Sequence, residues 1–349
     1  MQFRSDNAGP AHPKVLEAMV AANTGYAPGY GADALMDGVT AQLRALFEAP
    51  EAAVYLVATG TAANALALAT LCQPWQTVFC ARVAHVQEDE CNAPEFFSGG
   101  AKLTLVGEAD KFSTAELRAA MEAEEIRGVH GAQRGPVTVT QSTELGRLYT
   151  LDELAAISEV AHGFGQPVYM DGARFSNAVA ALGCTPAEMT WRAGVDAVSF
   201  GGTKNGCVGV EAVIFFDPAK AWEFELRRKR GAHLFSKHRY LSAQMAAYLE
   251  EALWLENARA ANAGCARLAE GLSGVEGVSF LHAPEANALF AEMPREMHRR
   301  LMEAGAAYNL WGASPAAVRD EGGPLLARFV CDWALPEAEI DRFVEIARG

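Results

Sequence analysis

The chain has 349 residues, of which 50% are hydrophobic and 21% charged, and its formal net charge is −14. Because single hydrophobic cores stop growing at roughly 250–300 residues, this length predicts two domains rather than one. The acidic balance argues against nucleic acid or an anionic membrane as the main partner, since either would need a basic surface.

The cysteines and the apolar segments bear on the cellular compartment. Seven cysteines are scattered without paired spacing, which is typical of reduced thiols rather than of a disulfide framework or a zinc site. The first residues show neither a signal-peptide core nor a basic presequence, and no apolar run approaches the roughly 18 residues of a membrane span. We therefore expect a cytoplasmic protein without a membrane anchor.

The first two thirds of the sequence alternate between strand-like and helix-like segments. The expected strands cover 52–59, 136–142, 166–171 and 195–202, and Ala- and Leu-rich helical patterns lie between them, as at 61–72 and 150–165. Thr150 offers a helix N-cap, and Gly163 and Gly165 offer a stop before the next strand. Strands that alternate with helices of ten or more residues are typical of βαβ units and a mostly parallel sheet.

The pattern changes past about residue 245. A continuous amphipathic segment over 242–272 predicts one long helix, and short strands follow at 277–282, 288–293 and 326–333 before a last helix. We therefore expect a large α/β domain over 1–245 and a smaller α+β domain over 246–349, carried on the long helix.

In a doubly wound sheet, ligands bind beyond the carboxyl ends of the strands. The first such end is the stretch Thr59-Gly60-Thr61, directly before the expected helix. Free backbone N–H groups and hydroxyls at a helix N-terminus form an anion site that suits phosphate, although plain N-capping would explain this stretch taken alone. The stretch lacks both the Walker lysine and the GxGxxG spacing, so neither a nucleoside triphosphate nor a dinucleotide is implied.

His85 follows the apolar run over 77–84 and precedes Glu88, Asp89 and Glu90. We expect this polar cluster to lie outside the deep core. An imidazole at such a position could stack on a flat ring or move protons near neutral pH.

Asp171 ends the strand expected at 166–171, and Arg174 follows it closely. The carboxylate could form a local ion pair with Arg174, hold a metal, or pair with a protonated ring nitrogen. A metal would need further ligands nearby, and the sequence indicates none, so we predict no metal site.

Lys204 follows the strand expected at 195–202, within the stretch GGTKNG. We expect Gly201, Gly202 and Gly206 to let the backbone come close to a ligand. Burial between apolar strands would lower the pKa of the lysine and supply the neutral amine that a Schiff base needs. A phosphate cradle, a strand-end aspartate and a strand-end lysine are together the parts that pyridoxal phosphate requires.

With these residues and several longer motifs, the chain resembles the threonine aldolase family nearly from end to end. The motifs are "RSDN", "GTAAN", "AHVQEDECNAPEFFSGG", "QSTELGRLYTLDEL", "MDGARFSNA", "FGGTKNG" and "RFVCDW". They are most similar to the bacterial branch of low-specificity L-threonine and phenylserine aldolases. The resemblance implies the aspartate-aminotransferase-like fold of pyridoxal phosphate enzymes.

The resemblance also implies roles for individual residues. Lys204 would hold the aldehyde of the cofactor as a Schiff base, Asp171 would pair with its pyridine nitrogen, and His85 would stack on its ring. Gly60 and Thr61 would bind its phosphate.

Further implied roles concern the substrate and the neighbouring subunit. Ser5, Arg174 and Arg328 would bind the substrate carboxylate, with Arg174 also part of the cofactor site. Arg239 corresponds to an arginine that reaches the phosphate of a neighbouring subunit, in a tetramer whose active sites lie at a dimer interface. Two departures are that glycines replace the serines common before the lysine, and that His130 aligns poorly with a second active-site histidine, so its role stays open.

The implied activity is cleavage of the Cα–Cβ bond of L-threonine, L-allo-threonine and related β-hydroxy-α-amino acids, phenylserine among them, to glycine and an aldehyde. His85 could take the hydroxyl proton directly or position a water for that purpose. Three alternatives remain at this point: a β-eliminating lyase, an aminotransferase or serine hydroxymethyltransferase-like enzyme, and a protein that binds pyridoxal phosphate without catalysis.

Overall fold

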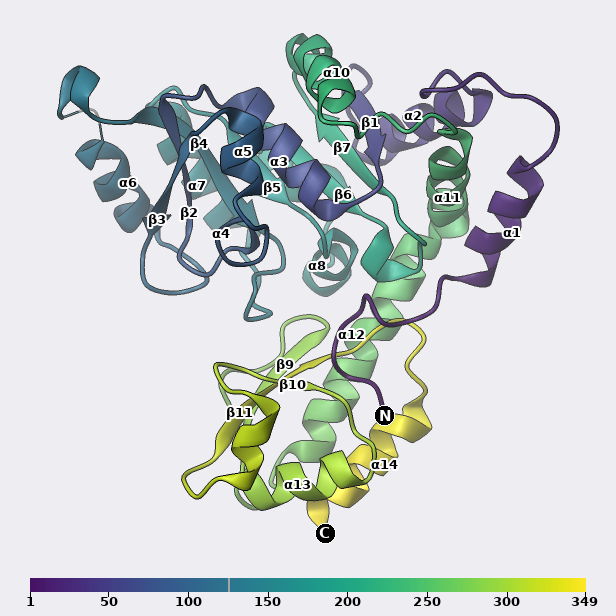
Figure 1. Cartoon of the computed structure of the whole chain (residues 1–349), viewed down its shortest axis with the longest axis vertical. Helices are drawn as coiled ribbons and strands as arrows, with labels where there is room; N and C mark the ends of the chain where they lie inside the picture. The colour runs from purple at the N-terminus through teal and green to yellow at the C-terminus, as the bar shows by residue number, and fades with distance from the viewer. Residues whose placement is uncertain (125) are drawn as a thin grey trace.

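The structure is a computed structural model of the whole chain, and its described residues are 1–124 and 126–349. The chain forms two lobes, and the long helix α12 (Leu253–Leu272) runs from the larger lobe into the smaller one (Figure 1). Two clusters of buried side chains correspond to the lobes. Among the described residues, no helix has the length and the apolar character needed to cross a membrane.

The larger lobe is built on a seven-stranded sheet. Strand β7 (Glu211–Phe215) runs antiparallel to its two neighbours, β1 and β6, and all other adjacent pairs of strands are parallel. Every strand but β7 therefore points its carboxyl end to the same edge. In spatial order the strands are β1 (Ala53–Val57), β7 (Glu211–Phe215), β6 (Ala197–Gly201), β5 (Val168–Asp171), β4 (Gln133–Thr140), β2 (Gln76–Ala81) and β3 (Lys102–Val106). The predicted α/β class with a mostly parallel sheet is confirmed.

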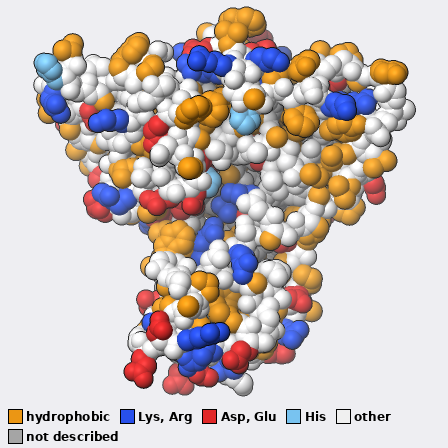
Figure 2. Space-filling view, in the orientation of Figure 1, with side chains coloured by type: hydrophobic (Ala, Val, Ile, Leu, Met, Phe, Trp, Pro, Cys, Tyr) orange, Lys and Arg blue, Asp and Glu red, His pale blue; other side chains and the backbone are white. Residues whose placement is uncertain are grey.

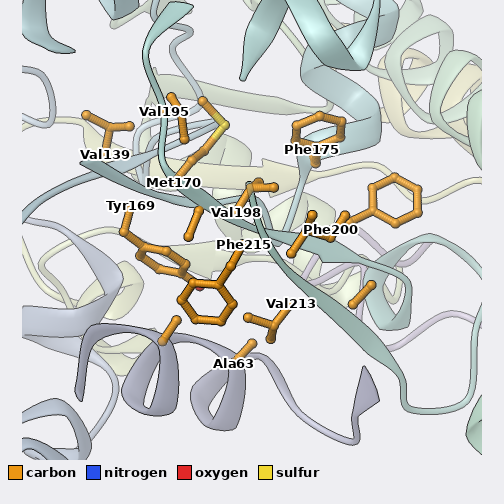
Figure 3. Close-up of a cluster of buried hydrophobic side chains, with 14 of the residues drawn as sticks. Ala63, Val139, Tyr169, Met170, Phe175, Val195, Val198, Phe200, Val213 and Phe215 are labelled. Atoms are coloured by element: carbon orange, nitrogen blue, oxygen red, sulfur yellow. The ribbon is translucent and has the colours of Figure 1, made fainter. Parts of the chain in front are cut away.

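Both faces of this sheet are covered, which explains why its central strands are apolar throughout. On one face, Tyr169, Val213 and Phe215 point toward Ala63 of α3 (Figure 3). Met170 lies on the opposite face, which α8 covers. The helices of this lobe are α1 (Pro13–Ala22), α2 (Ala34–Leu46), α3 (Gly60–Leu71), α4 (His85–Glu88), α5 (Ala93–Ser98), α6 (Thr114–Ala123), α7 (Leu151–Gly163), α8 (Phe175–Leu182), α9 (Pro186–Met189), α10 (Ala221–Arg230) and α11 (Arg239–Leu249).

Helix boundaries follow local capping chemistry. Thr150 caps α7 as predicted, because its side chain accepts the Glu153 N–H while the Glu153 carboxylate accepts the Thr150 N–H. The helix ends at Gly163, as expected, and Gly165 takes a left-handed conformation with φ +71°.

The predicted continuous helix over 242–272 is wrong in one respect. Helix α11 ends at Leu249 and α12 begins at Leu253, with the short turn η5 (Glu250–Ala252) between them. Glu251 and Ala252 have φ of 50° and 56°, so the helical hydrogen-bond ladder cannot continue through them. An apolar periodicity persists across a kink of this kind, which is why the sequence pattern does not reveal it.

The smaller lobe carries a four-stranded sheet in the order β10 (Asn309–Leu310), β11 (Leu325–Val330), β9 (Ala288–Met293), β8 (Ser279–Phe280), with antiparallel pairs throughout. Helices α12, α13 (Arg295–Glu303) and α14 (Glu337–Arg348) complete it. Phe3 packs into this lobe against Phe329 and Phe343, so the first residues of the chain join the second core. The division of the chain into 1–245 and 246–349 stays a prediction.

Candidate active site

The candidate residues after the strands gather at the edge where six carboxyl ends meet. Gly60 opens α3 after β1, His85 opens α4 after β2, and Asp171 is the last residue of β5. Lys204 lies in the turn η3 (Thr203–Asn205), directly after β6. In Figure 2, Lys and Arg side chains gather with acidic ones beside them where the two lobes meet. The sheet direction therefore brings together residues that are far apart in the sequence.

The expected anion cradle lies at the start of α3. The helix begins at Gly60, and Thr59 is its N-cap, because the Thr59 hydroxyl accepts the Ala62 N–H at 3.2 Å. A Cβ added at Gly60 would meet nothing within 4 Å, so open space adjoins the first helical residue. The first-turn N–H groups and the helix dipole thus face room for an anion.

Asp171 is 1% exposed and has both carboxylate oxygens occupied by neutral donors. The Ala173 N–H donates to Oδ1 and Asn64 Nδ2 donates to Oδ2, each at 3.0 Å. The Asn64 amide is itself fixed, since its Oδ1 accepts a hydrogen bond from the Tyr169 hydroxyl at 2.8 Å. These hydrogen bonds hold the carboxylate in one orientation. Sequence reasoning missed Asn64, although the quoted motif GTAAN contains it.

Lys204 is partly buried among charged groups. Burial lowers the pKa of Lys204, and the Arg174 cation lowers it further, while the carboxylates of Asp6, Asp171 and Glu144 act in the opposite direction. The predicted direction of the shift is confirmed. A lowered lysine pKa raises the fraction of neutral amine, which is the nucleophilic form.

The glycines around Lys204 also have a reason within the protein, which the sequence did not predict. A Cβ at Gly201 would lie 2.5 Å from the Ala173 carbonyl oxygen, and one at Gly202 would lie 2.7 Å from that of Val210. Gly206 has φ +111° and would place a Cβ 2.7 Å from Asn257 Nδ2. Close approach of protein to protein therefore requires these glycines, and their predicted role in letting the backbone approach a ligand stays a prediction.

Glu211 holds the turn that carries Lys204, and sequence reasoning missed it. Its side chain is 5% exposed, and Oε2 accepts the Gly202 N–H at 3.0 Å. Burial raises the pKa of Glu211 to about 7, although hydrogen bonds from Thr203 and Gly202 act to lower it. An acidic residue inside the apolar run over 207–216 was the available signal, because such a residue needs a buried partner.

Arg174 pairs with Asp6 rather than with Asp171, so the local ion pair considered from the sequence is wrong. Arg174 Nε and Nη2 donate to Asp6 Oδ2 and Oδ1 at 2.7 and 3.0 Å, and both side chains are buried. Asn287 Nδ2 adds a third hydrogen bond to Asp6. Burial opposes ionisation of Asp6, but the charges of Arg174 and Lys204 hold its pKa below the usual value.

Arg328 on β11 and Ser5 come to the site from the smaller lobe and the N-terminal segment. Burial and the neighbouring Arg174 cation lower the pKa of Arg328. Its Nε is buried, with no hydrogen-bond partner in the described part of the chain. An unpaired buried guanidinium nitrogen is costly, and it suits a carboxylate ligand. Ser5 Oγ accepts the Asn7 N–H at 3.1 Å, so the serine also shapes its own turn.

His85 lies beside two carboxylates. Its Nδ1 is 3.7 Å from Asp89 Oδ2. A ring nitrogen of His85 and one carboxylate oxygen each of Asp89 and Glu144 lie within 4.8 Å of one another. Glu90 departs from the prediction that the residues after His85 avoid the deep core, because it is 3% exposed. Its burial follows from a partner on another element, Asn64, which the local sequence does not reveal.

Arg239, which is predicted to serve a neighbouring subunit, and His130, whose role stays open, lie apart from this group. Arg239, at the start of α11, donates through Nη1 to the Gly25 carbonyl oxygen at 3.0 Å. His130 is exposed in the turn η1 (Gly128–His130), just before β4, and so lies toward the opposite edge of the sheet. The structure thus gives His130 no place beside Lys204.

The residues fit pyridoxal phosphate. Lys204 has a lowered pKa, Asp171 is a fixed carboxylate, and the N-terminus of α3 faces open space. The unpaired Nε of Arg328 adds a donor for an anionic substrate. Each part that the cofactor and an amino acid require is present at one edge of the sheet.

Comparisons with known proteins agree with this geometry. The sequence profile of the beta-eliminating lyase family matches residues 2–296. A low specificity L-threonine aldolase from Pseudomonas sp. is 42% identical over 97% of this chain and 94% of its own length. One from Pseudomonas aeruginosa is 43% identical over 99% of this chain and 96% of its own length.

Solved structures extend the likeness to the fold. A threonine aldolase from Leishmania major superposes with a TM-score of 0.91 at 26% identity, covering 99% of this chain and 98% of that one. The expected fold is therefore confirmed. The chain belongs to the beta-eliminating lyase family, and within it to the threonine aldolases.

Proposed function

We propose that this protein is a pyridoxal-phosphate-dependent aldolase that cleaves the Cα–Cβ bond of L-threonine, L-allo-threonine and related β-hydroxy-α-amino acids, phenylserine among them. The products are glycine and an aldehyde. The observation that carries the proposal is the meeting of Lys204, Asp171 and the N-terminus of α3 at one edge of the sheet. Arg328 adds a buried Nε that has no hydrogen-bond partner among the described residues.

Different protein groups have different tasks in this proposal, and His85 has two. Bound pyridoxal phosphate supplies a ring that accepts the electron pair of the broken Cα–Cβ bond. Lys204 binds the aldehyde carbon of the cofactor, Asp171 keeps the ring nitrogen protonated, and Gly60 and Thr61 bind the phosphate. His85 stacks on the ring.

Substrate orientation decides which bond breaks. Arg328, Arg174 and Ser5 bind the carboxylate, which fixes rotation about the Cα–N bond and sets the Cα–Cβ bond perpendicular to the ring. His85, beside Asp89 and Glu144, takes the β-hydroxyl proton directly or through a water. The aldehyde then leaves, and a proton returns to Cα to give glycine.

The test uses purified protein with L-threonine and no second substrate. We expect acetaldehyde and glycine in equal amounts and a visible absorption band from the cofactor bound to Lys204. Lys204→Ala should lose both the band and glycine production, whereas Lys102→Ala, which removes an exposed lysine on β3, should keep both. Cleavage of threonine by Lys204→Ala would refute the proposal.

The family description favours β-elimination as the second candidate. That reaction would release a 2-keto acid and ammonia instead of glycine and an aldehyde, so the same reaction mixture distinguishes the two. An aminotransferase would need a keto-acid acceptor, and a non-catalytic binding protein would show the band without any product.

We also infer that the active enzyme is a cytoplasmic homo-oligomer, a tetramer with active sites at a dimer interface. The seven cysteines are free, which suits a reducing compartment. Large apolar side chains are exposed on α1, on α2 and between them, namely Leu16, Val20, Tyr26, Tyr30 and Leu35. Hydrophobic side chains also gather on the side of α1 and α2 in Figure 2. Arg239 on the neighbouring α11 could then reach the cofactor phosphate in the site of the partner subunit. Sedimentation velocity tests this assembly, and a monomer would contradict it.

A further inference from the structure

Glu90 is a buried acid close to Asp171, and the proposed chemistry does not use it. It follows α4 and is 3% exposed. Its Oε1 accepts a hydrogen bond from Asn64 Nδ2 at 2.7 Å, whereas Oε2 is buried without a partner in the described part of the chain. A bare carboxylate in this position would leave one charged oxygen unsolvated, which is costly.

The charges around Glu90 do not compensate for its burial. Burial raises the pKa of Glu90 to about 8; the Asn64 hydrogen bond and the Lys204 cation lower it, and the carboxylates of Asp171 and Glu144 raise it. Lys204 is the one cation among these neighbours, and it also lies beside Asp6 and Asp171. Geometry and charge therefore both favour the neutral acid at neutral pH.

Asn64 connects Glu90 to Asp171 through a single amide group. One Nδ2 hydrogen goes to Glu90 Oε1 and the other to Asp171 Oδ2. The Tyr169 hydroxyl donates to Oδ1, which fixes the direction in which the amide lies. Both N–H groups and the oxygen of the Asn64 amide are thus hydrogen-bonded. Loss of the Glu90 acceptor would leave a buried N–H group unpaired or let the amide turn away from Asp171.

We propose that Glu90 is a positioning residue of the proposed ring-nitrogen site, in which the neutral carboxylic acid fixes Asn64 and Asn64 in turn fixes Asp171. The proposal rests on the proposed function, because it assumes that Asp171 pairs with the pyridine nitrogen of bound pyridoxal phosphate. Glu90 itself touches neither the ring nor the substrate in this arrangement. At neutral pH, where Glu90 is uncharged, its effect should reach the cofactor through Asn64.

The test measures pyridoxal phosphate affinity of the apo-protein and the pH dependence of the visible band, both without substrate. Glu90→Gln keeps a neutral acceptor for Asn64, so we expect its Kd within about twofold of the wild type. Glu90→Ala removes the acceptor and should weaken binding about tenfold, the scale of one buried hydrogen bond. Glu88→Gln, an exposed change two residues away, is the matched control and should behave like the wild type.

The pH profile tests the protonation state. The wild type should show a change in the band centred near pH 8, as Glu90 ionises beside Asp171, and Glu90→Gln should lack that change. If Glu90→Gln weakens binding as much as Glu90→Ala, the ionised carboxylate is what matters and the proposal is wrong. If Glu90→Ala fails to fold, the comparison of Glu90→Gln with the wild type still decides.

A double-mutant cycle tests the route. In an Asn64→Ala background, Glu90→Ala should have no further effect on cofactor affinity, because the connecting amide is already gone. Equal effects of Glu90→Ala in both backgrounds would overturn the proposal. A wild type that binds no pyridoxal phosphate would instead refute the proposed function, so the two failures are distinguishable.

Discussion

Asp6→Asn should destabilise the protein strongly, because Asp6 is the counter-ion of a buried arginine. The two hydrogen bonds from Arg174 measure 2.7 and 3.0 Å, and the exposed fractions of the two residues are 5% and 8%. Removing one partner of a buried pair leaves an uncompensated charge, which costs about 3–5 kcal/mol of the free energy of unfolding. Asn keeps the size of the side chain, so the loss reports charge rather than packing.

The pH dependence of this loss follows from the pKa of Asp6. Its folded-state pKa lies below the ordinary value of 3.8, so the stability that it contributes is fully present above that pH. The contribution disappears as the pH falls through the folded-state pKa. The wild type and Asp6→Asn should therefore differ most near neutral pH and converge in strong acid.

Urea unfolding of both proteins measures the difference, with Asp341→Asn as the control. Arg267 contacts Asp341 with the same two-pronged geometry, at 2.7 and 2.8 Å, but on the surface, where solvent screens the pair. We expect the control to unfold near the wild-type urea concentration. If Asp6→Asn unfolds there too, burial of the Arg174 pair does not carry the energy assigned to it.

Two further changes test the turn that carries Lys204. Gly201→Ala should lower the free energy of unfolding by about 1–3 kcal/mol, because its Cβ would lie 2.5 Å from the Ala173 carbonyl oxygen. Gly163→Ala is the control, because a Cβ there would have no neighbouring atom within 4 Å. Equal urea midpoints for the two variants would contradict this reasoning. Glu211→Gln should flatten stability against pH. The pKa of Glu211 rises on folding from 4.5 to about 7, so the wild type loses stability as the pH increases across that window. If the urea midpoints of the wild type and Glu211→Gln fall equally over this pH range, Glu211 is not the cause.

The sequence predicts those site residues that have a local signal. Asp171 and Lys204 follow apolar strands directly, and parallel strands bring their carboxyl ends to one edge, so position along the chain implies position in space. Thr150 and Gly163 mark α7 because capping involves neighbours within one turn. The seven-stranded order, by contrast, depends on which strands lie side by side, and the alternating pattern contains no information on that.

The parts that escaped prediction depend on distant partners. Asp6 and Arg174 are 168 positions apart, and nothing near either residue indicates the other. Glu90 looked like a surface residue because Glu88 and Asp89 precede it, yet its partner Asn64 lies on α3. Such polar groups can be buried only where the tertiary fold supplies a partner, so their burial follows from the fold rather than from local composition.

The Asp6–Arg174 pair also changes how the proposed substrate carboxylate would be held. Asp6 already takes Nε and Nη2 of Arg174, which leaves Nη1 as the nitrogen that Asp6 does not use. Arg328 keeps a buried Nε without an acceptor in the described residues. In the proposed complex, a two-pronged contact with the substrate would therefore fall to Arg328, while Arg174, neutralised by Asp6, would contribute one donor and a fixed position. Since Arg328 stands on the smaller lobe and Lys204 on the larger, substrate orientation would depend on how the two lobes pack.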